Sequence, residues 1–327
     1  MDAGEVRHWN VDVNGVSIHV AEQGPADGTA VLLLHGFPEL WFSWRHQMAA
    51  LAARGFRALA PDLRGYGESS VPDDPAAYSI FHLVGDVVAL LDHLQLTKVP
   101  PFLFASFQLT SRSGVIDLSC GVLTLTMDAS VGVRCRTRLG SPGGVAWLLC
   151  LFRPDRVRAV VALGVPYFPR HPRPMTEVFA AFGDGFYMTQ FQITSLLLLE
   201  WRSDFLEASP SPLPWIAEEE LIQYAEKFQK SGFTGPLNYY RMAETNWRLL
   251  APWNGAKITV PAKFIAGDKD IGVQSFGIEQ YIKSGGFKSN VPELEVAIID
   301  GHHFLQQEQA ERVNSEILSY LDKFTSE

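Results

Sequence analysis

Two residues late in the chain have the chemical types and the spacing of an acid–base pair. Asp270 follows the apolar segment Phe264-Ile265-Ala266-Gly267, and His303 follows a segment that ends at Ile299-Asp300. If both segments are strands of one parallel sheet, the two residues lie on loops at the same edge of that sheet. A carboxylate in that position can orient an imidazole, which then acts as a base.

The residues themselves leave two alternatives to this pair. An aspartate on such a loop is also a common turn or capping residue, so Asp270 alone carries little weight. His302 directly precedes His303, and nothing local separates the two as the base. An acid and a histidine that each follow a strand nevertheless favour catalysis over a structural role.

A turn after an earlier apolar run offers a second chemical element. His35-Gly36-Phe37-Pro38 follows the run Ala30–Leu34. A tight turn there can direct the backbone N–H of Phe37 into the site as a donor to an oxyanion. A plain connecting turn is the alternative.

The elements that position these residues alternate between strands and helices. Residues 6–23 have the pattern of two strands around Asn14-Gly15, which is a strong hairpin signal. Apolar runs predict strands buried on both faces of a parallel sheet, and apolar residues at intervals of three and four predict helices over it. The further strands expected are 30–34, 56–60, 156–163, 262–266 and 294–299, and the helices are 43–54, 79–96, 144–152 and 306–324. The pattern predicts a doubly wound, mostly parallel α/β sheet.

A long segment inside this alternation has a different character. Between Val165 and Trp253 the strand pattern lapses and aromatic residues dominate. We expect residues 167–245 to form a helical lid over the carboxyl edge of the sheet, enclosing a mostly apolar pocket. The α/β core then comprises residues 1–166 and 246–327.

Composition excludes several classes of protein. With 47% hydrophobic and 19% charged residues in 327, the chain has enough apolar material for a globular core. Its formal net charge of −9 argues against nucleic-acid binding, because phosphates require clustered Lys and Arg. The three cysteines lack the spacing of a metal site. No apolar run approaches the ~20 residues of a membrane span and no leader is visible, so we expect a cytoplasmic protein.

Five motifs together resemble those of the plant-type soluble epoxide hydrolases, a family with the α/β-hydrolase fold. They are 35–48 (HGFPELWFSWRHQM), 61–67 (PDLRGYG), 149–156 (LCLFRPDR), 232–241 (GFTGPLNYYR) and 249–253 (LLAPW). The resemblance covers residues 5–99, 145–192 and 213–324. Its order of acid before histidine agrees with the pair above, and the family pattern selects His303 over His302.

The resemblance implies a two-step hydrolysis. In this family an Asp carboxylate attacks an epoxide carbon, two lid tyrosines hydrogen-bond the epoxide oxygen, and a His/Asp pair activates water to cleave the ester. A carboxylate forms a hydrolysable ester, and a phenol of pKa ~10 donates a hydrogen bond without being ionised. By this resemblance Tyr187 and Tyr240 are the donors, Asp270 orients the base, and His303 is the base. Simple packing is the alternative for each tyrosine.

The resemblance also implies the surroundings of the reaction. His35, Phe37, Pro38 and Trp41 would contribute to the oxyanion turn and to the pocket wall. The substrate would be a small lipophilic epoxide, such as a fatty-acid epoxide, with no cofactor and no metal. The protein would act as a monomer or a homodimer.

One segment departs from the family. The family has His-Asp-Trp-Gly after the strand that here begins at Lys98, but this chain continues with PPFLFASF and an unrelated stretch. Counting back from Cys150 places Gly140 where the nucleophile belongs. A second departure follows Phe191-Gln192, where the lid is shortened. The two breaks favour an aberrant transcript or gene model, with residues 105–143 as the atypical segment.

Other residues are weaker candidates for the nucleophile. Asp128 follows the strand-like Val122-Leu123-Thr124-Leu125, but residues 131–144 have no helical periodicity behind it. Ser141 precedes Pro142, which lacks the N–H that an oxyanion donor needs. Ser106 has no small residue two positions later.

Three hypotheses remain after this comparison. The first is an epoxide hydrolase that acts through an ester intermediate. The second is a catalytically silent variant, or a small-molecule binding protein of the same fold, because the nucleophilic Asp motif is absent. The third, a serine esterase, requires Ser141 or Ser106 within hydrogen-bond reach of His303.

Overall fold

One mixed sheet forms the centre of the molecule. The computed structural model describes residues 4–96, 102–105, 144–181, 187–192, 214–275 and 277–324. In these residues the strands pair in the order β1-β2-β4-β3-β5-β6-β7-β8, antiparallel from β1 to β2 and from β2 to β4 and parallel elsewhere. The strands are β1 (Arg7–Val13), β2 (Val16–Gln23), β3 (Ala30–Leu34), β4 (Arg57–Pro61), β5 (Phe102–Ala105), β6 (Val160–Leu163), β7 (Ala262–Gly267) and β8 (Leu294–Ile299). The predicted α/β-hydrolase type of sheet is confirmed.

The N-terminal hairpin has the turn that its sequence predicts. Asn14 and Gly15 both have positive φ, 48° and 78°, and Val13 pairs with Val16 across the turn. Two residues with positive φ form the turn whose twist matches that of antiparallel strands. The hairpin is thereby closed with both strands in register.

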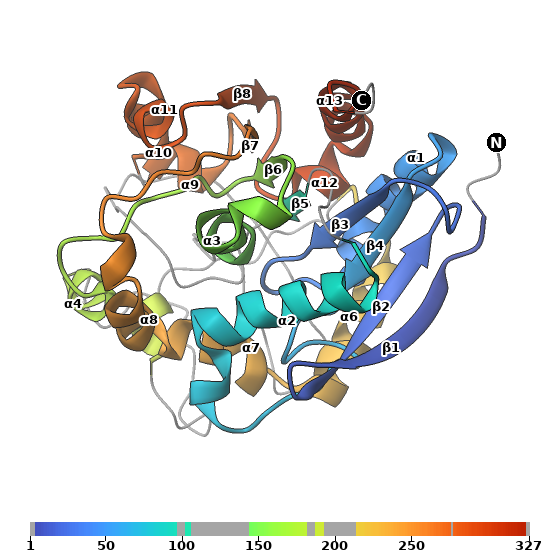
Figure 1. Cartoon of the computed structure of the whole chain (residues 1–327), viewed down its shortest axis with the longest axis horizontal. Coiled ribbons are helices and arrows are strands. Elements are labelled where there is room, and N and C mark those ends of the chain that lie inside the picture. Colours follow the sequence, from blue (N-terminus) through green and yellow to red (C-terminus); the bar gives the residue numbers. More distant parts are fainter. Residues whose placement is uncertain are drawn as a thin grey trace.

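Helices cover both faces of the sheet (Figure 1). Alternate residues of β3 show the two layers, because Leu32 and Leu34 pack with α2 and α3 whereas Val31 and Leu33 pack with α1 and α13. The helices are α1 (Arg45–Ala53), α2 (Ile80–His93), α3 (Val145–Phe152), α4 (Met175–Ala180), α5 (Tyr187–Gln190), α6 (Glu218–Ser231), α7 (Thr234–Arg241), α8 (Ala243–Leu249), α9 (Ile271–Ser275), α10 (Ile278–Lys283), α11 (Gly286–Asn290), α12 (Leu305–Glu308) and α13 (Ala310–Leu321). Within the described residues, no helix combines the length and the apolar character needed to cross a membrane.

The last helix of the chain differs from its prediction. The expected helix over 306–324 is wrong as one element, because it is divided into α12 and α13 at Gln309, whose φ of −123° is not helical. The interruption leaves the carbonyl of Gln306 to accept a hydrogen bond from Gln47 Nε2 at 2.9 Å. Side-chain contacts with α1 therefore compensate for the broken helical ladder.

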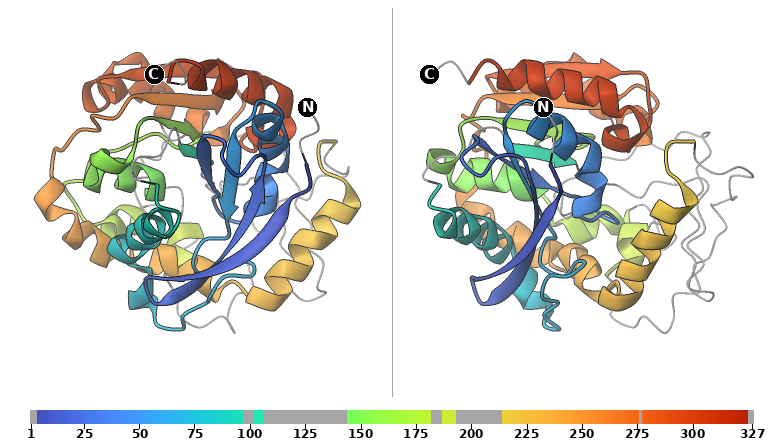
Figure 2. Two further views of the ribbon diagram at one scale, coloured as in Figure 1. Left: turned by 45° about the vertical axis from the view of Figure 1, so that its right-hand side comes forward. Right: turned by 90° about the vertical axis from the view of Figure 1, so that its right-hand side faces the viewer.

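Helices α4 to α8 occupy the chain between β6 and β7, and α7 and α8 lie at the opposite end of the molecule from α13 (Figure 2). Helix α7 is held closely on the loop after β4. A Cβ atom on Gly235 would lie 2.6 Å from the Gly65 carbonyl oxygen, so only glycine permits this approach. Tyr239 Oη donates to the Arg64 carbonyl at 2.7 Å. The segments PDLRGYG and GFTGPLNYYR are therefore packed against each other in the structure. The limits of the lid, 167–245, and of the core remain a prediction.

Candidate active site

The structure brings the predicted acid and base together. His303 Nδ1 lies 2.7 Å from Asp270 Oδ2, and the other carboxylate oxygen accepts from the backbone N–H of Gly272 at 2.7 Å. Asp270 is fully buried and His303 is buried. Because a carboxylate accepts and does not donate, the proton lies on Nδ1 and the lone pair of the ring lies on Nε2. This tautomer is the one that can take a proton from water.

The close approach of two loops makes this pair possible. A Cβ atom on Gly267, at the end of β7, would lie 2.1 Å from the Gly301 carbonyl oxygen. Lys269 N donates to that carbonyl at 3.0 Å, and Gly301 N donates to Asp268 Oδ1 at 3.1 Å. The loops after β7 and β8 are thus joined by hydrogen bonds along the segments that carry Asp270 and His303.

The turn after β3 is tied to the rest of the core by His35. Its Nδ1 contacts the Gly36 carbonyl at 2.8 Å, and its Nε2 accepts from the backbone N–H of Leu63 at 3.0 Å. Burial lowers the pKa of His35, so the ring is neutral. Both ring nitrogens are engaged with the backbone, which gives His35 a role in holding the turn. The peptide bond that follows, between Phe37 and Pro38, is cis.

An aromatic cluster surrounds the Phe37 ring. The ring centroids of Phe191, Phe233 and Tyr240 lie 6.0, 6.3 and 5.8 Å from that of Phe37, each edge to face. Tyr240 is fully buried, and its hydroxyl has no hydrogen-bond partner in the described part of the chain. A buried hydroxyl without a partner costs free energy, which is a feature of sites that bind a polar ligand atom.

For several predicted site residues the structure does not test the predicted role. The Trp41 ring lies edge-on to His8 and Phe42, with centroids 4.9 and 5.6 Å away, so its role in the pocket wall stays a prediction. Tyr187 begins α5, but its side chain lies outside the described atoms. Asp128 and the alternatives Ser106, Ser141 and Gly140 lie outside the described residues.

A buried carboxyl group that the sequence did not single out lies beside the pair. Glu39 Oε2 accepts from the backbone N–H of Gly36 at 3.2 Å, and Oε1 accepts from Gln306 Nε2. Burial raises the pKa of Glu39 to about 7, although hydrogen bonds from Ser43, Gly36 and Gln306 and the nearby His303 oppose this shift. A carboxyl with such a pKa can exchange a proton near neutral pH.

One feature of the sequence could have identified Glu39 as a functional residue. It stands two residues after Phe37 in a segment, HGFPELWF, that is otherwise almost wholly apolar. Glutamate is rarely buried unless it is paired, so an acidic residue there indicates a specific environment. Its partner Gln306 is distant in the sequence and gives no comparable signal.

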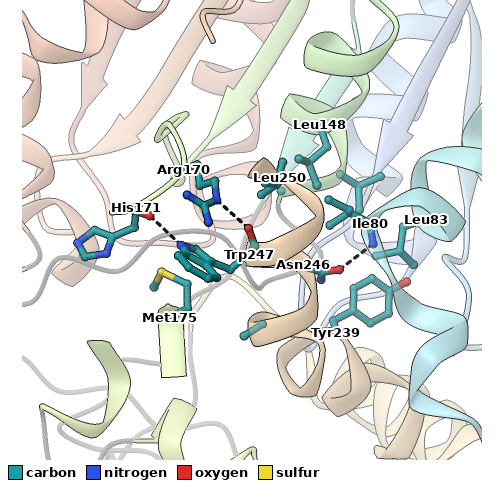
Figure 3. A pocket seen from close by; sticks show the side chains of 13 residues that line it. Ile80, Leu83, Leu148, Arg170, His171, Met175, Tyr239, Asn246, Trp247 and Leu250 are labelled. Carbon is teal, nitrogen blue, oxygen red and sulfur yellow. Dashed lines mark hydrogen bonds between the residues drawn. The ribbon is translucent and has the colours of Figure 1, made fainter. Parts of the chain in front are cut away.

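A pocket lies apart from the acid–base pair, between α2, α3 and α8 (Figure 3). The Arg170 guanidinium lies 3.9 Å from the ring centroid of Trp247, and Trp247 Nε1 donates to the His171 carbonyl at 2.7 Å. Much of the rest of its wall is apolar, including Ile80, Leu83, Leu148 and Leu250, and Asn246 adds a polar amide. Neither Asp270 nor His303 is among the described residues that line it.

Comparison with known proteins gives consistent similarities. Residues 29–100 match the family model of the alpha/beta hydrolase fold. "Epoxide hydrolase 3" of Siraitia grosvenorii is 39% identical over an alignment of 355 positions, gaps included, which covers 98% of this chain and 99% of the relative. The crystal structure of epoxide hydrolase VrEH1 from Vigna radiata has a TM-score of 0.79 at 42% identity and 98% coverage of both chains. Potato (Solanum tuberosum) epoxide hydrolase I has a TM-score of 0.80 at 38% identity, covering 98% of this chain and 100% of its own.

The raised pKa of Glu39 predicts a pH dependence of stability. Between about pH 4.5 and about pH 7 the folded protein holds a proton that the unfolded chain releases. The free energy of unfolding of the wild type should therefore fall, by up to ~3 kcal/mol, as pH rises through this window, relative to Glu39→Gln. Urea unfolding of both proteins checks this, because the titrating groups that do not interact with Glu39 cancel in the difference. Parallel pH curves would contradict the assignment.

Proposed function

Because the chain belongs to the epoxide hydrolase family of the α/β hydrolases, we propose that it opens lipophilic epoxides, such as fatty-acid epoxides, to vicinal diols through an ester intermediate. The observation that carries this proposal is the buried 2.7 Å contact between His303 and Asp270. A histidine held in this tautomer by a buried carboxylate is suited to activate the water that cleaves an ester.

The reaction would proceed in two steps. A carboxylate of the chain attacks an epoxide carbon, the C–O bond of the ring breaks, and the Tyr240 phenol hydrogen-bonds and protonates the oxygen that leaves. His303 Nε2 then takes a proton from water, and the resulting hydroxide attacks the ester carbonyl. Collapse of that intermediate releases the diol and restores the carboxylate. The proton on His303 returns to the Tyr240 oxygen, with Asp270 stabilising the imidazolium meanwhile.

The lipophilic class of substrate rests on the aromatic cluster. The rings of Phe37 and Phe191 lie against the Tyr240 ring, with centroids 5.8 and 5.0 Å away, and Phe233 packs on Phe37. Burial raises the pKa of Tyr240 far above its ordinary value, so the phenol keeps its proton. An apolar wall with a single polar donor fits a molecule whose polar part is one ether oxygen. We further propose that the chain is cytoplasmic and that residues 167–245 act as the lid.

A second function has one specific observation in its favour. The family's His-Asp-Trp-Gly motif is missing from the sequence between Lys98 and Cys150. Without a nucleophile most of the rate is lost, because the members of such a site act as a unit. The protein would then be a silent variant that binds small molecules in the same apolar surroundings.

Removal of the base should abolish turnover. His303→Gln preserves the size of the side chain and a hydrogen bond to Asp270 but supplies no base, so kcat should fall by roughly 10³-fold or more. Hydrolysis of a styrene-type epoxide and of a fatty-acid epoxide, followed as diol formation, measures this. A folded wild type with no turnover above buffer would instead support the silent variant.

Tyr240→Phe should separate catalysis from stability. The change removes a buried hydroxyl that has no partner in the described residues, so the free energy of unfolding should stay the same or rise by up to ~1 kcal/mol. Loss of the donor to the epoxide oxygen should lower kcat by about 10²-fold. Urea unfolding and diol formation measure the two effects. A loss of stability above ~1 kcal/mol with unchanged kcat would show that Tyr240 is a packing residue.

Isotope labelling should locate the nucleophile. In the two-step reaction the oxygen of water remains in the enzyme carboxylate, while the original carboxylate oxygen leaves in the diol. Turnover in H₂¹⁸O, followed by peptide mass spectrometry, should therefore label one Asp or Glu of the chain. Label at Asp128 would identify that residue. Diol formation without any labelled residue would exclude the ester intermediate.

A further inference from the structure

A chain of hydrogen bonds connects Glu39 to a helix of the segment between β6 and β7. Ser43 Oγ lies 2.7 Å from Tyr224 Oη on α6. Ser43 also hydrogen-bonds the Glu39 carboxylate. All three side chains are buried, and Ser43 and Tyr224 lie 181 positions apart in the sequence. The contact between Ser43 and Tyr224 therefore depends on the position of α6 relative to the core.

The direction of these bonds follows from the number of protons. A serine hydroxyl has one proton to donate, and a carboxylate only accepts. When Ser43 donates to ionised Glu39, Tyr224 must donate to Ser43. With the N–H groups of Gly36 and Gln306, the carboxylate then receives three donors. If Glu39 is protonated, it no longer requires Ser43 as a donor and can itself donate to Ser43, so the donation from Tyr224 no longer supports a charge.

Ion pairs fix α6 on both sides of Tyr224. Glu220 pairs with Arg45 Nε at 2.7 Å, and both Lys227 and Lys230 pair with Glu68 at 2.6 Å. Residues three and four apart lie on one face of a helix, so Glu220, Tyr224 and Lys227 face the core together. Tyr224 reaches Ser43 only when this face is seated.

We propose that Tyr224 is a positioning residue that acts through Ser43, so that seating of α6 on the core favours the ionised form of Glu39 beside His303. An ionised Glu39 stabilises positive charge on His303, which forms when that ring takes a proton from water. The chemistry of the base is thereby coupled to the position of a helix above it. This role in catalysis rests on the proposed function, whereas the coupling between Tyr224 and Glu39 does not.

Apart from His303, the titratable groups around Glu39 do not change their charge near neutral pH. Besides His303 on the loop after β8, the described titratable side chains around it are Tyr66 on the loop after β4 and Tyr224. Burial raises the pKa values of both tyrosines well above their ordinary value, so they remain neutral. Arg45 and Glu220 act on Tyr224 with opposite signs.

The test measures the ionisation of Glu39 directly. In protein labelled with ¹³C at the glutamate carboxyl carbons, the signal that titrates near neutral pH and is missing in Glu39→Gln belongs to Glu39. Tyr224→Phe should move its midpoint upward by roughly half to one pH unit, because the carboxylate loses support from the hydroxyl chain. Ser43→Ala, which removes the direct donor, should move it upward by about one to two units.

The matched control is Tyr320→Phe, which removes the hydroxyl of another buried tyrosine, on α13. Its midpoint should equal that of the wild type. An unchanged midpoint in Tyr224→Phe, or an equal shift in Tyr320→Phe, would overturn the proposal. If Tyr224→Phe does not fold, Ser43→Ala decides, and an unshifted midpoint there overturns the proposal as well. The titration needs no turnover, so an inactive wild type would refute the catalytic proposal and leave this result readable.

Discussion

The site depends on carboxyl groups that are held out of water at the carboxyl edge of the sheet, where each must be compensated. Asp270 has His303 and a backbone N–H. At Asp62, burial by itself raises the pKa, but the hydrogen bond from His19 and further donors outweigh it, and the pKa stays below its ordinary value. At Glu39 burial prevails and the pKa rises to about 7. The same edge thus contains a carboxyl whose pKa is held low, at Asp62, and one that can change its charge near neutral pH, at Glu39.

The sheet and the helices above it carry different kinds of polar group. The sheet loops carry Glu39, Asp270 and His303, whereas α6 and α7 carry Tyr224 and Tyr240. The two sets meet because α7 lies on Gly65 through Gly235 and because ion pairs hold α6 at Glu68. A movement of α7 would move Tyr240, and a movement of α6 would move Tyr224, whose hydroxyl lies 2.7 Å from Ser43 Oγ.

Much of the fold was predictable because its signals are local. The strands β3 and β8 have the expected bounds, since a continuous apolar run defines β3 and a run interrupted only by Glu295 defines β8. The contact between Asp270 and His303 followed from parallel strands that end at one edge. Glu39, Ser43 and Tyr224 were missed as a set, because 181 positions separate Ser43 from Tyr224 and neither has a pattern that indicates the other. The division of the C-terminal helix was missed for the same reason, since side chains of α1 compensate for it.

The sequence by itself determined the α/β architecture and the family, and it predicted that Asp270 and His303 meet, because periodicity, turn chemistry and short motifs act over a few residues. Tertiary structure alone decided the state of the groups around them. Whether a carboxyl is charged depends on how far it is removed from water and on how many donors reach it, and both depend on distant segments packing together. The sequence gives the identities of Glu39 and Tyr240. Only the fold raises the pKa of Glu39 to about 7 and leaves the Tyr240 hydroxyl without a partner among the described residues.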